Sequence, residues 1–127
     1  MKSYTDIEQS KKLAKILPLE SADMCYSNDG TAIKIDANSY TVRYSMWKDY
    51  VVEIIPCWSL AALLDLMPKI HGERPKLDTG RIQTEKYYVE YPYHESTKDD
   101  WYSTKLCDSA VDAAFEMVCW LKETGKL

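Results

Sequence analysis

The sequence is poor in the residues from which common catalytic and cofactor sites are built. Its 127 residues include two histidines, four glycines and a single phenylalanine. The glycines form no glycine-rich loop of the kind that holds phosphate groups, which disfavours the usual nucleotide-dependent enzymes. No His-x-x-x-His or Cys-x-x-Cys pair, the spacings typical of metal sites, occurs in the sequence. We therefore expect no cofactor and no bound metal, and we assign no catalytic residue.

Export signals and long apolar runs are also missing. Residues 1–10 contain no apolar stretch of the kind found in a signal peptide. The longest apolar run, residues 60–64, is far too short to span a bilayer. We expect a cytoplasmic protein with no membrane segment, in which the widely spaced cysteines are free thiols. These cysteines are Cys25, Cys57, Cys107 and Cys119.

The charge balance argues against a general nucleic-acid binder. The net charge of −4 gives little attraction for polyanions or anionic membranes. Residues 69–91, however, combine basic side chains with strand tyrosines, as in a platform on which single-stranded bases stack. Acidic side chains interleave with the basic ones, so nucleic-acid binding is an alternative and not the leading hypothesis. The candidate contacts would be Lys76, Arg81, Lys86 and Tyr88.

Apolar periodicity and turn signals predict an α+β protein. Helices are expected at residues 6–17, at residues 59–67 and between Ser109 and Gly125. Strands are expected at residues 31–36, 40–45, 50–55, 81–91 and 101–106, with an extra short strand near Met24. Short turns between successive strands imply antiparallel pairing. We expect one domain over residues 1–127, a two-layer fold of order α-β-β-β-α-β-β-α with three helices on a sheet of about five strands.

Local signals set the expected boundaries of these elements. Thr5-x-x-Glu8 has the form of a capping box at the start of the first helix. Residues 50–55 are apolar on both faces, which favours a central strand, and Pro56 should end it. Residues 68–80 contain two prolines and two glycines, and they should form the longest loop.

The terminal helix has too wide an apolar arc to be covered on one side only. Its polar residues form a narrow stripe made of Ser109, Asp112, Glu116 and Glu123. The remaining surface must be buried by the rest of the domain or by a second chain. We expect a homodimer, with the loop at residues 68–80 folding over the helices as the competing explanation. The expected interface residues are Trp120, Met117 and Phe115, because aromatic side chains commonly anchor interfaces.

Three segments carry a resemblance to a known group of proteins. They are Ile-Leu-Pro-Leu-Glu-Ser-Ala-Asp-Met at residues 16–24, Pro-Cys-Trp-Ser-Leu-Ala-Ala-Leu-Leu at residues 56–64 and Asp-Ala-Ala-Phe-Glu-Met-Val-Cys-Trp-Leu at residues 112–121. Together they resemble small uncharacterised proteins of Bacteroidales phages, prophages and mobile elements. The resemblance implies an accessory gene product, and it supplies no functional residue.

Three functions follow from these observations. The leading hypothesis is a non-catalytic accessory protein that binds an unidentified protein or associates with itself. The second is a small enzyme of an unfamiliar type, which a site containing Cys57 or His94 with a shifted pKa would favour. The third is the nucleic-acid binder described above, which would need a continuous basic face carrying exposed tyrosines.

The thiol prediction can be tested directly. All four cysteines should react as free thiols in the denatured protein before any reductant is added. Thiol titration under denaturation, with and without prior reduction, measures this. Fewer free thiols before reduction than after it would contradict the expected reducing compartment.

Overall fold

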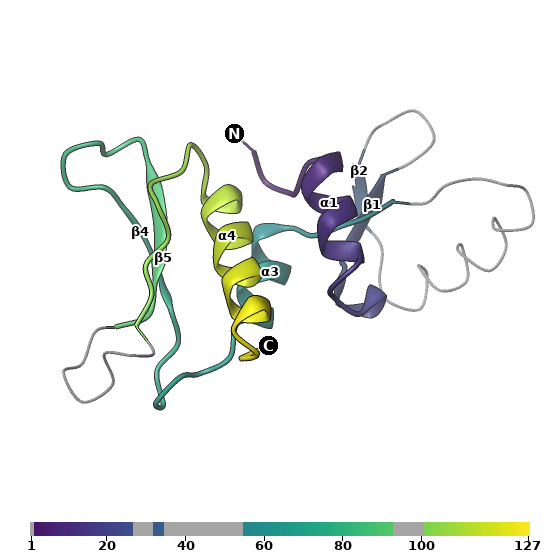
Figure 1. Cartoon of the computed structure of the whole chain (residues 1–127). Coiled ribbons are helices and arrows are strands. Elements are labelled where there is room, and N and C mark those ends of the chain that lie inside the picture. The colour runs from purple at the N-terminus through teal and green to yellow at the C-terminus, as the bar shows by residue number, and fades with distance from the viewer. Residues whose placement is uncertain (1, 27–31, 35–54, 93–100) are drawn as a thin grey trace, which may run out of the picture. The chain divides into compact units, whose positions relative to one another are not determined.

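The computed structural model describes residues 2–26, 32–34, 55–92 and 101–127 (Figure 1). These residues form two compact units, which we call the N-terminal unit (residues 4–62) and the C-terminal unit (residues 1–3 and 63–127). Each unit has a helix packed against a small antiparallel sheet, which agrees with the expected α+β class. The expectation of a single domain over residues 1–127 stays a prediction.

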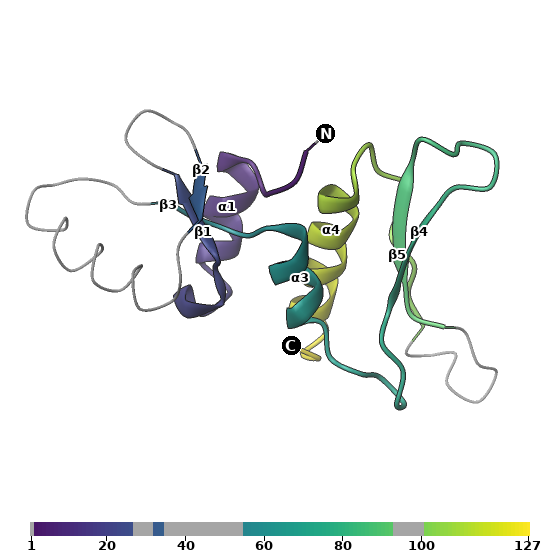
Figure 2. The same cartoon turned by 180° about the vertical axis from the view of Figure 1, so that it is seen from behind.

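The described residues of the N-terminal unit include the helix α1, a 3₁₀ turn and a three-stranded sheet (Figures 1 and 2). The helix α1 packs against strand β3. The strands pair in the antiparallel order β2-β1-β3. The bounds are α1 (Ile7–Ala14), the turn η1 (Leu19–Ser21), β1 (Met24–Tyr26), β2 (Ala32–Lys34) and β3 (Ile55–Cys57).

The start of α1 differs from the prediction. The helix is capped by Asp6, whose side chain accepts the amide hydrogen of Gln9 while the Gln9 side chain accepts from the Asp6 amide. The expected capping box of Thr5 and Glu8 is therefore wrong by one residue. The reason is that the Thr5 hydroxyl is fully buried and bonded elsewhere in the unit.

The position of Pro56 is a second difference. Pro56 does not end a strand but lies inside β3, opposite Cys25. β3 is an outer strand of the described sheet, and an outer strand can leave one backbone position without a donor. The central strand is β1, the short strand expected near Met24. The expected strand at residues 40–45 and most of the one at residues 50–55 lie outside the described residues.

The C-terminal unit is built around the long terminal helix and a two-stranded hairpin. Helix α3 (Leu60–Leu66) begins in the N-terminal unit and continues into this one. Strands β4 (Lys76–Thr79) and β5 (Tyr87–Glu90) pair in antiparallel register, and α4 (Ala110–Glu123) packs against them, as both views show (Figures 1 and 2). The five strands of the described residues therefore form two sheets and not the single sheet expected.

Two expectations for this hairpin are corrected. Residues 68–80 are not one long loop, because residues 76–79 form β4. Leu77 is the only strongly apolar residue of that strand, so the sequence carries little strand signal, and pairing with β5 supplies the missing stabilisation. The strand expected over residues 81–91 begins only at Tyr87, since residues 80–86 form the connection between the strands.

The segment expected as the last strand is an irregular neighbour of β5. Tyr87 and Cys107 exchange two backbone hydrogen bonds of 2.8 Å, and Glu90 forms an isolated bridge with Ser103. The register shifts by one residue between these two pairs, which is the mark of a β-bulge. At the bulge the Thr104 hydroxyl accepts the amide hydrogen of Val89 at 3.0 Å. The bulge interrupts regular pairing, so residues 101–106 carry no continuous strand.

Helix α4 is capped as the sequence predicts at both ends. The Ser109 hydroxyl accepts the amide hydrogen of Asp112 at 3.0 Å. At the other end Gly125 has φ of +73°, and the Lys126 amide donates to the Leu121 carbonyl at 2.9 Å, which completes a Schellman motif. Its wide apolar arc is buried within the chain, as the buried residues Val111, Ala113, Ala114, Phe115, Met117, Val118, Cys119 and Leu121 show.

The burial of this arc gives a stability prediction. Phe115 is 8% exposed, and Phe115→Ala should lower the free energy of unfolding by about 3–5 kcal/mol because it leaves a cavity. Glu116 is half-buried and forms only a long ion pair of 3.7 Å with exposed Lys105, so Glu116→Ala should change it by less than about 1 kcal/mol. Urea unfolding of both variants is the measurement. A loss below about 1 kcal/mol for Phe115→Ala would show that this face of the helix is not core.

Candidate functional site

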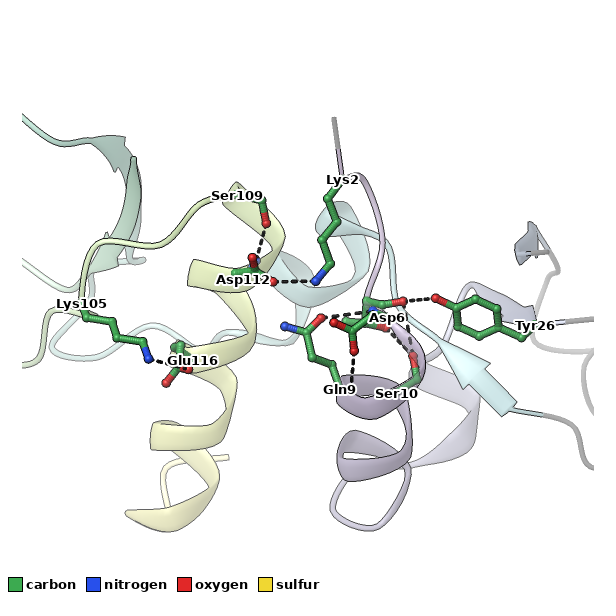
Figure 3. A network of polar contacts seen from close by, with 10 residues as sticks. Lys2, Asp6, Gln9, Ser10, Tyr26, Lys105, Ser109, Asp112 and Glu116 are labelled. Carbon is green, nitrogen blue, oxygen red and sulfur yellow. Dashed lines mark hydrogen bonds and ion pairs between the residues drawn. The ribbon is translucent and has the colours of Figure 1, made fainter. Parts of the chain in front are cut away.

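The polar groups buried in the N-terminal unit meet at Thr5. The Thr5 hydroxyl bonds to the Ser10 hydroxyl at 2.7 Å and accepts the Trp58 amide hydrogen at 3.1 Å. The Thr5 carbonyl accepts from the Tyr26 hydroxyl at 2.6 Å (Figure 3). No side-chain nitrogen or oxygen buried in the described part of the chain lacks a hydrogen-bond partner. The cluster is fully satisfied, and it therefore holds the unit together and offers no free group to a substrate.

The serine and aspartate pair closest to a catalytic arrangement also has a structural use. The Ser59 hydroxyl and the Ser59 backbone amide both donate hydrogen bonds to the Asp23 carboxylate, and the amide nitrogen lies 2.9 Å from the carboxylate oxygen. The same hydroxyl accepts the amide hydrogen of Ala62 and so caps the first turn of α3. Asp23 thus fixes the cap in place. A serine held in this way is bonded on both its donor and acceptor sides, which is the arrangement of a helix cap and not of a nucleophile.

The candidate nucleophile Cys57 is a deactivated thiol. Burial raises its pKa to about 12, with a smaller contribution from Cys25. A thiol is reactive when its pKa is lowered, so Cys57 contributes almost no thiolate near neutral pH. Cys107 shows the same direction, because burial raises its pKa as well. Both pKa values are shifted in the direction that deactivates a thiol, so neither cysteine supports the enzyme hypothesis.

The four cysteines are all free and buried. In the three-stranded sheet, Cys57 lies opposite Met24 and Cys25 lies opposite Pro56. Directly paired residues share one face of a sheet, and neighbouring residues in a strand point to opposite faces. Cys25 and Cys57 therefore project from opposite faces of their sheet, and a disulfide between them would need the strands to rearrange.

The histidines do not form a site in the described structure. His71 and Gly72 have φ of 52° and 80° in a tight turn that is closed by hydrogen bonds between Ile70 and Glu73. His94 lies outside the described residues. No group of three or more histidine, cysteine, aspartate or glutamate side chains in the described ranges could hold a metal ion. His71 therefore forms part of a tight turn, with a positive φ that most residues adopt only with backbone strain.

The three residues expected at an interface differ in their exposure. Met117 is 0% exposed and Phe115 is 8% exposed, so both side chains are covered by the chain itself. Trp120 is half-buried. Its ring stacks on Tyr102 with centroids 4.4 Å apart and an interplanar angle of 3°, and the Lys126 ammonium lies 5.4 Å from its centroid. Of the three, Trp120 alone presents substantial surface, and that surface already takes part in contacts within the chain.

The expected nucleic-acid contacts are gathered on the β4–β5 hairpin. Lys76 and Tyr88 lie on the face of the pair that also carries Asp78 and Glu90, as the register shows. Lys86 forms an ion pair with Asp108, which raises the pKa of the lysine. Charges of both signs alternate on this face, and one of the four candidate contacts is neutralised. The hairpin is therefore not the continuous basic face that the nucleic-acid hypothesis requires.

The least covered apolar side chain of the described chain is one that the sequence did not single out. Ile82 is 97% exposed, and it lies in the connection between β4 and β5. The connection is closed by hydrogen bonds from Gly80 to the Lys86 carbonyl and from Lys86 to the Gln83 carbonyl, both 3.0 Å. A side chain at Gly80 would place its Cβ 2.7 Å from the Gln83 oxygen, so the turn requires glycine there.

Leu106 is a second exposed apolar side chain, close to Gly80 at the base of the same connection. It is 46% exposed, and one of its methyl carbons lies 3.3 Å from the position that a Cβ on Gly80 would take. We call Ile82 and Leu106 the tip patch. The sequence signal that could have found it is a lone isoleucine among the polar residues 81–86, which the prediction of a strand from residue 81 concealed.

The raised pKa values predict a loss of stability in alkali. Cys57 and Tyr26 have their pKa values raised by burial to about 12 from 9.0 and 10.0. Below the pKa of the unfolded chain, the folded and unfolded states both hold the proton, and the free energy of unfolding has its full value. Above about pH 9 the unfolded thiol ionises first, so the free energy of unfolding should fall by up to about 1.4 kcal/mol per pH unit for each group. Urea unfolding at several pH values between 8 and 11 measures this fall.

Cys57→Ala provides the control for this pH dependence. The variant should be less stable at pH 8 but should lose stability less steeply as the pH rises, because one of the ionising groups is gone. A slope equal to that of the unmodified chain would show that Cys57 does not contribute.

No protein-family model, curated protein or solved structure matches the chain. No helix in the described ranges combines the length and the apolar character needed to cross a membrane. The resemblance to phage and mobile-element proteins stays a prediction of the sequence.

Proposed function

We propose that the chain is a non-catalytic accessory protein that acts by binding another protein, and that its first partner is a second copy of itself. The observation that carries this proposal is Ile82, which is 97% exposed on a hydrogen-bonded turn. Covering an isoleucine side chain is worth roughly 1.5–3 kcal/mol, so a fixed and exposed one is a suitable anchor for a partner.

The surroundings of the tip patch also suit a protein partner. Arg81 and Glu85 are exposed on the same connection. In a two-fold contact, a residue that meets a second residue on the other copy is met by that residue in turn, so a positive and a negative side chain flanking one apolar anchor can pair across the contact. A nucleic acid would leave Glu85 without a partner. The mixed charge of this surface therefore favours a protein.

The tip patch is a better candidate interface than the face of α4. The sequence predicts an interface through Trp120, Met117 and Phe115, but the last two side chains are covered by the chain itself. Using them in a dimer would require the helix to separate from its neighbours. Using Ile82 requires no rearrangement, because its side chain already projects from the hairpin.

The wider setting rests on the sequence. The resemblance of residues 16–24, 56–64 and 112–121 supports a role as an accessory product of a phage or mobile element. The four free thiols support a cytoplasmic location.

The self-association predicted here is tested by changing Ile82. The unmodified chain should show a mass approaching twice 14.7 kDa as its concentration rises, and Ile82→Asp should return it to 14.7 kDa. Light scattering across a dilution series is the measurement. Ile82→Asp should leave the free energy of unfolding within about 0.5 kcal/mol of its original value, since the site is exposed.

Ile7→Asp is the matched control. Ile7 is the first residue of α1 and is exposed, and an acidic side chain is tolerated at a helix start. This variant should associate as the unmodified chain does. A mass of 14.7 kDa at every concentration would overturn self-association. Tight binding of a single-stranded oligonucleotide by the same sample, lost in Arg81→Ala, would favour the nucleic-acid hypothesis instead.

A further inference from the structure

The backbone groups of the C-terminal sheet divide into two sets. The amide of Gly80 donates to Lys86, which continues the pairing of Asp78 with Tyr88 and of Lys76 with Glu90. In an antiparallel ladder, bonded pairs recur at every second residue. The even-numbered residues of β4 therefore bond to β5, and the amide and carbonyl groups of odd-numbered residues point away from it.

The other side of β5 is already occupied. The amides of Tyr87 and Val89 donate to the Cys107 carbonyl and to the Thr104 hydroxyl, and the amide of Tyr91, just after the strand, donates to the Tyr102 carbonyl. Alternate residues of β5 thus bond to alternate sides, as the ladder rule requires. β4 has no such second neighbour among the described residues, so its outward groups, those of Leu77 and Thr79, form an open edge. Such an edge is a template on which another strand can add.

One outward group is taken by a side chain of the strand itself. The amide of Thr79 donates to the carboxylate of Asp78 at 2.8 Å. This amide would otherwise be one of two outward donors on β4, the other being that of Leu77. Pro75, immediately before the strand, has no amide hydrogen to offer in this direction. The edge is therefore short of donors at both ends.

We infer that the carboxylate of Asp78 guards the edge of β4 against addition of the same strand from a second copy of the chain. Consider two β4 strands paired antiparallel with Leu77 of one bonded to Thr79 of the other. This register would bring the two Asp78 side chains directly opposite each other, and like charges in that position are destabilising. It would also need the Thr79 amide that Asp78 occupies.

The neighbouring registers are weak for related reasons. If Leu77 of one copy pairs with Leu77 of the other, Thr79 comes to lie opposite Pro75. That pair forms no backbone hydrogen bond, because proline has no amide hydrogen and the Thr79 amide already donates to Asp78. Pairing centred on Thr79 itself uses the occupied amide twice. Asp78 therefore removes hydrogen bonds from each of these three antiparallel registers.

The experiment replaces Asp78 in a chain that also carries Ile82→Asp, so that association through the tip patch is absent. Asp78→Ala frees the Thr79 amide and removes the charge. Ile82→Asp alone should stay at 14.7 kDa and so sets an upper limit to the association constant. The double variant should exceed this limit by roughly tenfold or more, because each dimer regains two backbone hydrogen bonds. Light scattering over a dilution series measures the constant, and amide hydrogen exchange shows where contact forms.

Protection of the Leu77 and Thr79 amides should appear together with the association. Asp65→Ala is the same change at an exposed position on α3, and in the chain carrying Ile82→Asp it should leave the mass at 14.7 kDa. Asp78→Asn keeps an acceptor for Thr79 and should associate less than Asp78→Ala. A monomeric Asp78→Ala variant with a folded hairpin, or association without protection at Leu77 and Thr79, would overturn the inference.

Discussion

The N-terminal unit depends on one buried residue, Thr5. Its amide and hydroxyl bond to Trp58, its hydroxyl to Ser10 on α1, and its carbonyl to Tyr26 on β1. A chain segment that precedes the first helix thereby joins that helix to the central strand and to the end of β3. All of these groups are removed from water, so each would cost free energy if its partner were lost. The buried apolar cluster of Met24, Tyr26 and Cys57 packs on the same strands β1 and β3.

This buried use of Thr5 explains why sequence patterns placed the first helix cap one residue early. Threonine three residues before a glutamate is a sound local signal, but the bond that Thr5 makes to Trp58 spans 53 residues. Local patterns contain no information about such partners. The caps of α4 were predictable for the opposite reason, because Ser109 bonds within its own turn and Gly125 follows the last one.

The strands illustrate a different limit. The α+β class agrees with the prediction, yet the strands of the described residues are not all the expected ones. β4 lies in a segment expected to be a loop, and the segment expected as the last strand is broken by a bulge at Thr104. Strand formation at Lys76–Thr79 depends on the pairing offered by β5, which a reading of one segment at a time does not include. The exposure of Ile82 was hidden for the same reason, since it follows from where the hairpin turns.

The arrangement of thiols in the small sheet has a consequence for how the chain responds to oxidants. Cys25 and Cys57 project from opposite faces, and both are buried. No oxidant can join them while the sheet is intact, and each thiol becomes accessible only when the strands open. Joining this pair therefore requires the sheet to open, and the rate at which Cys57 reacts with an added thiol reagent reports how often it opens.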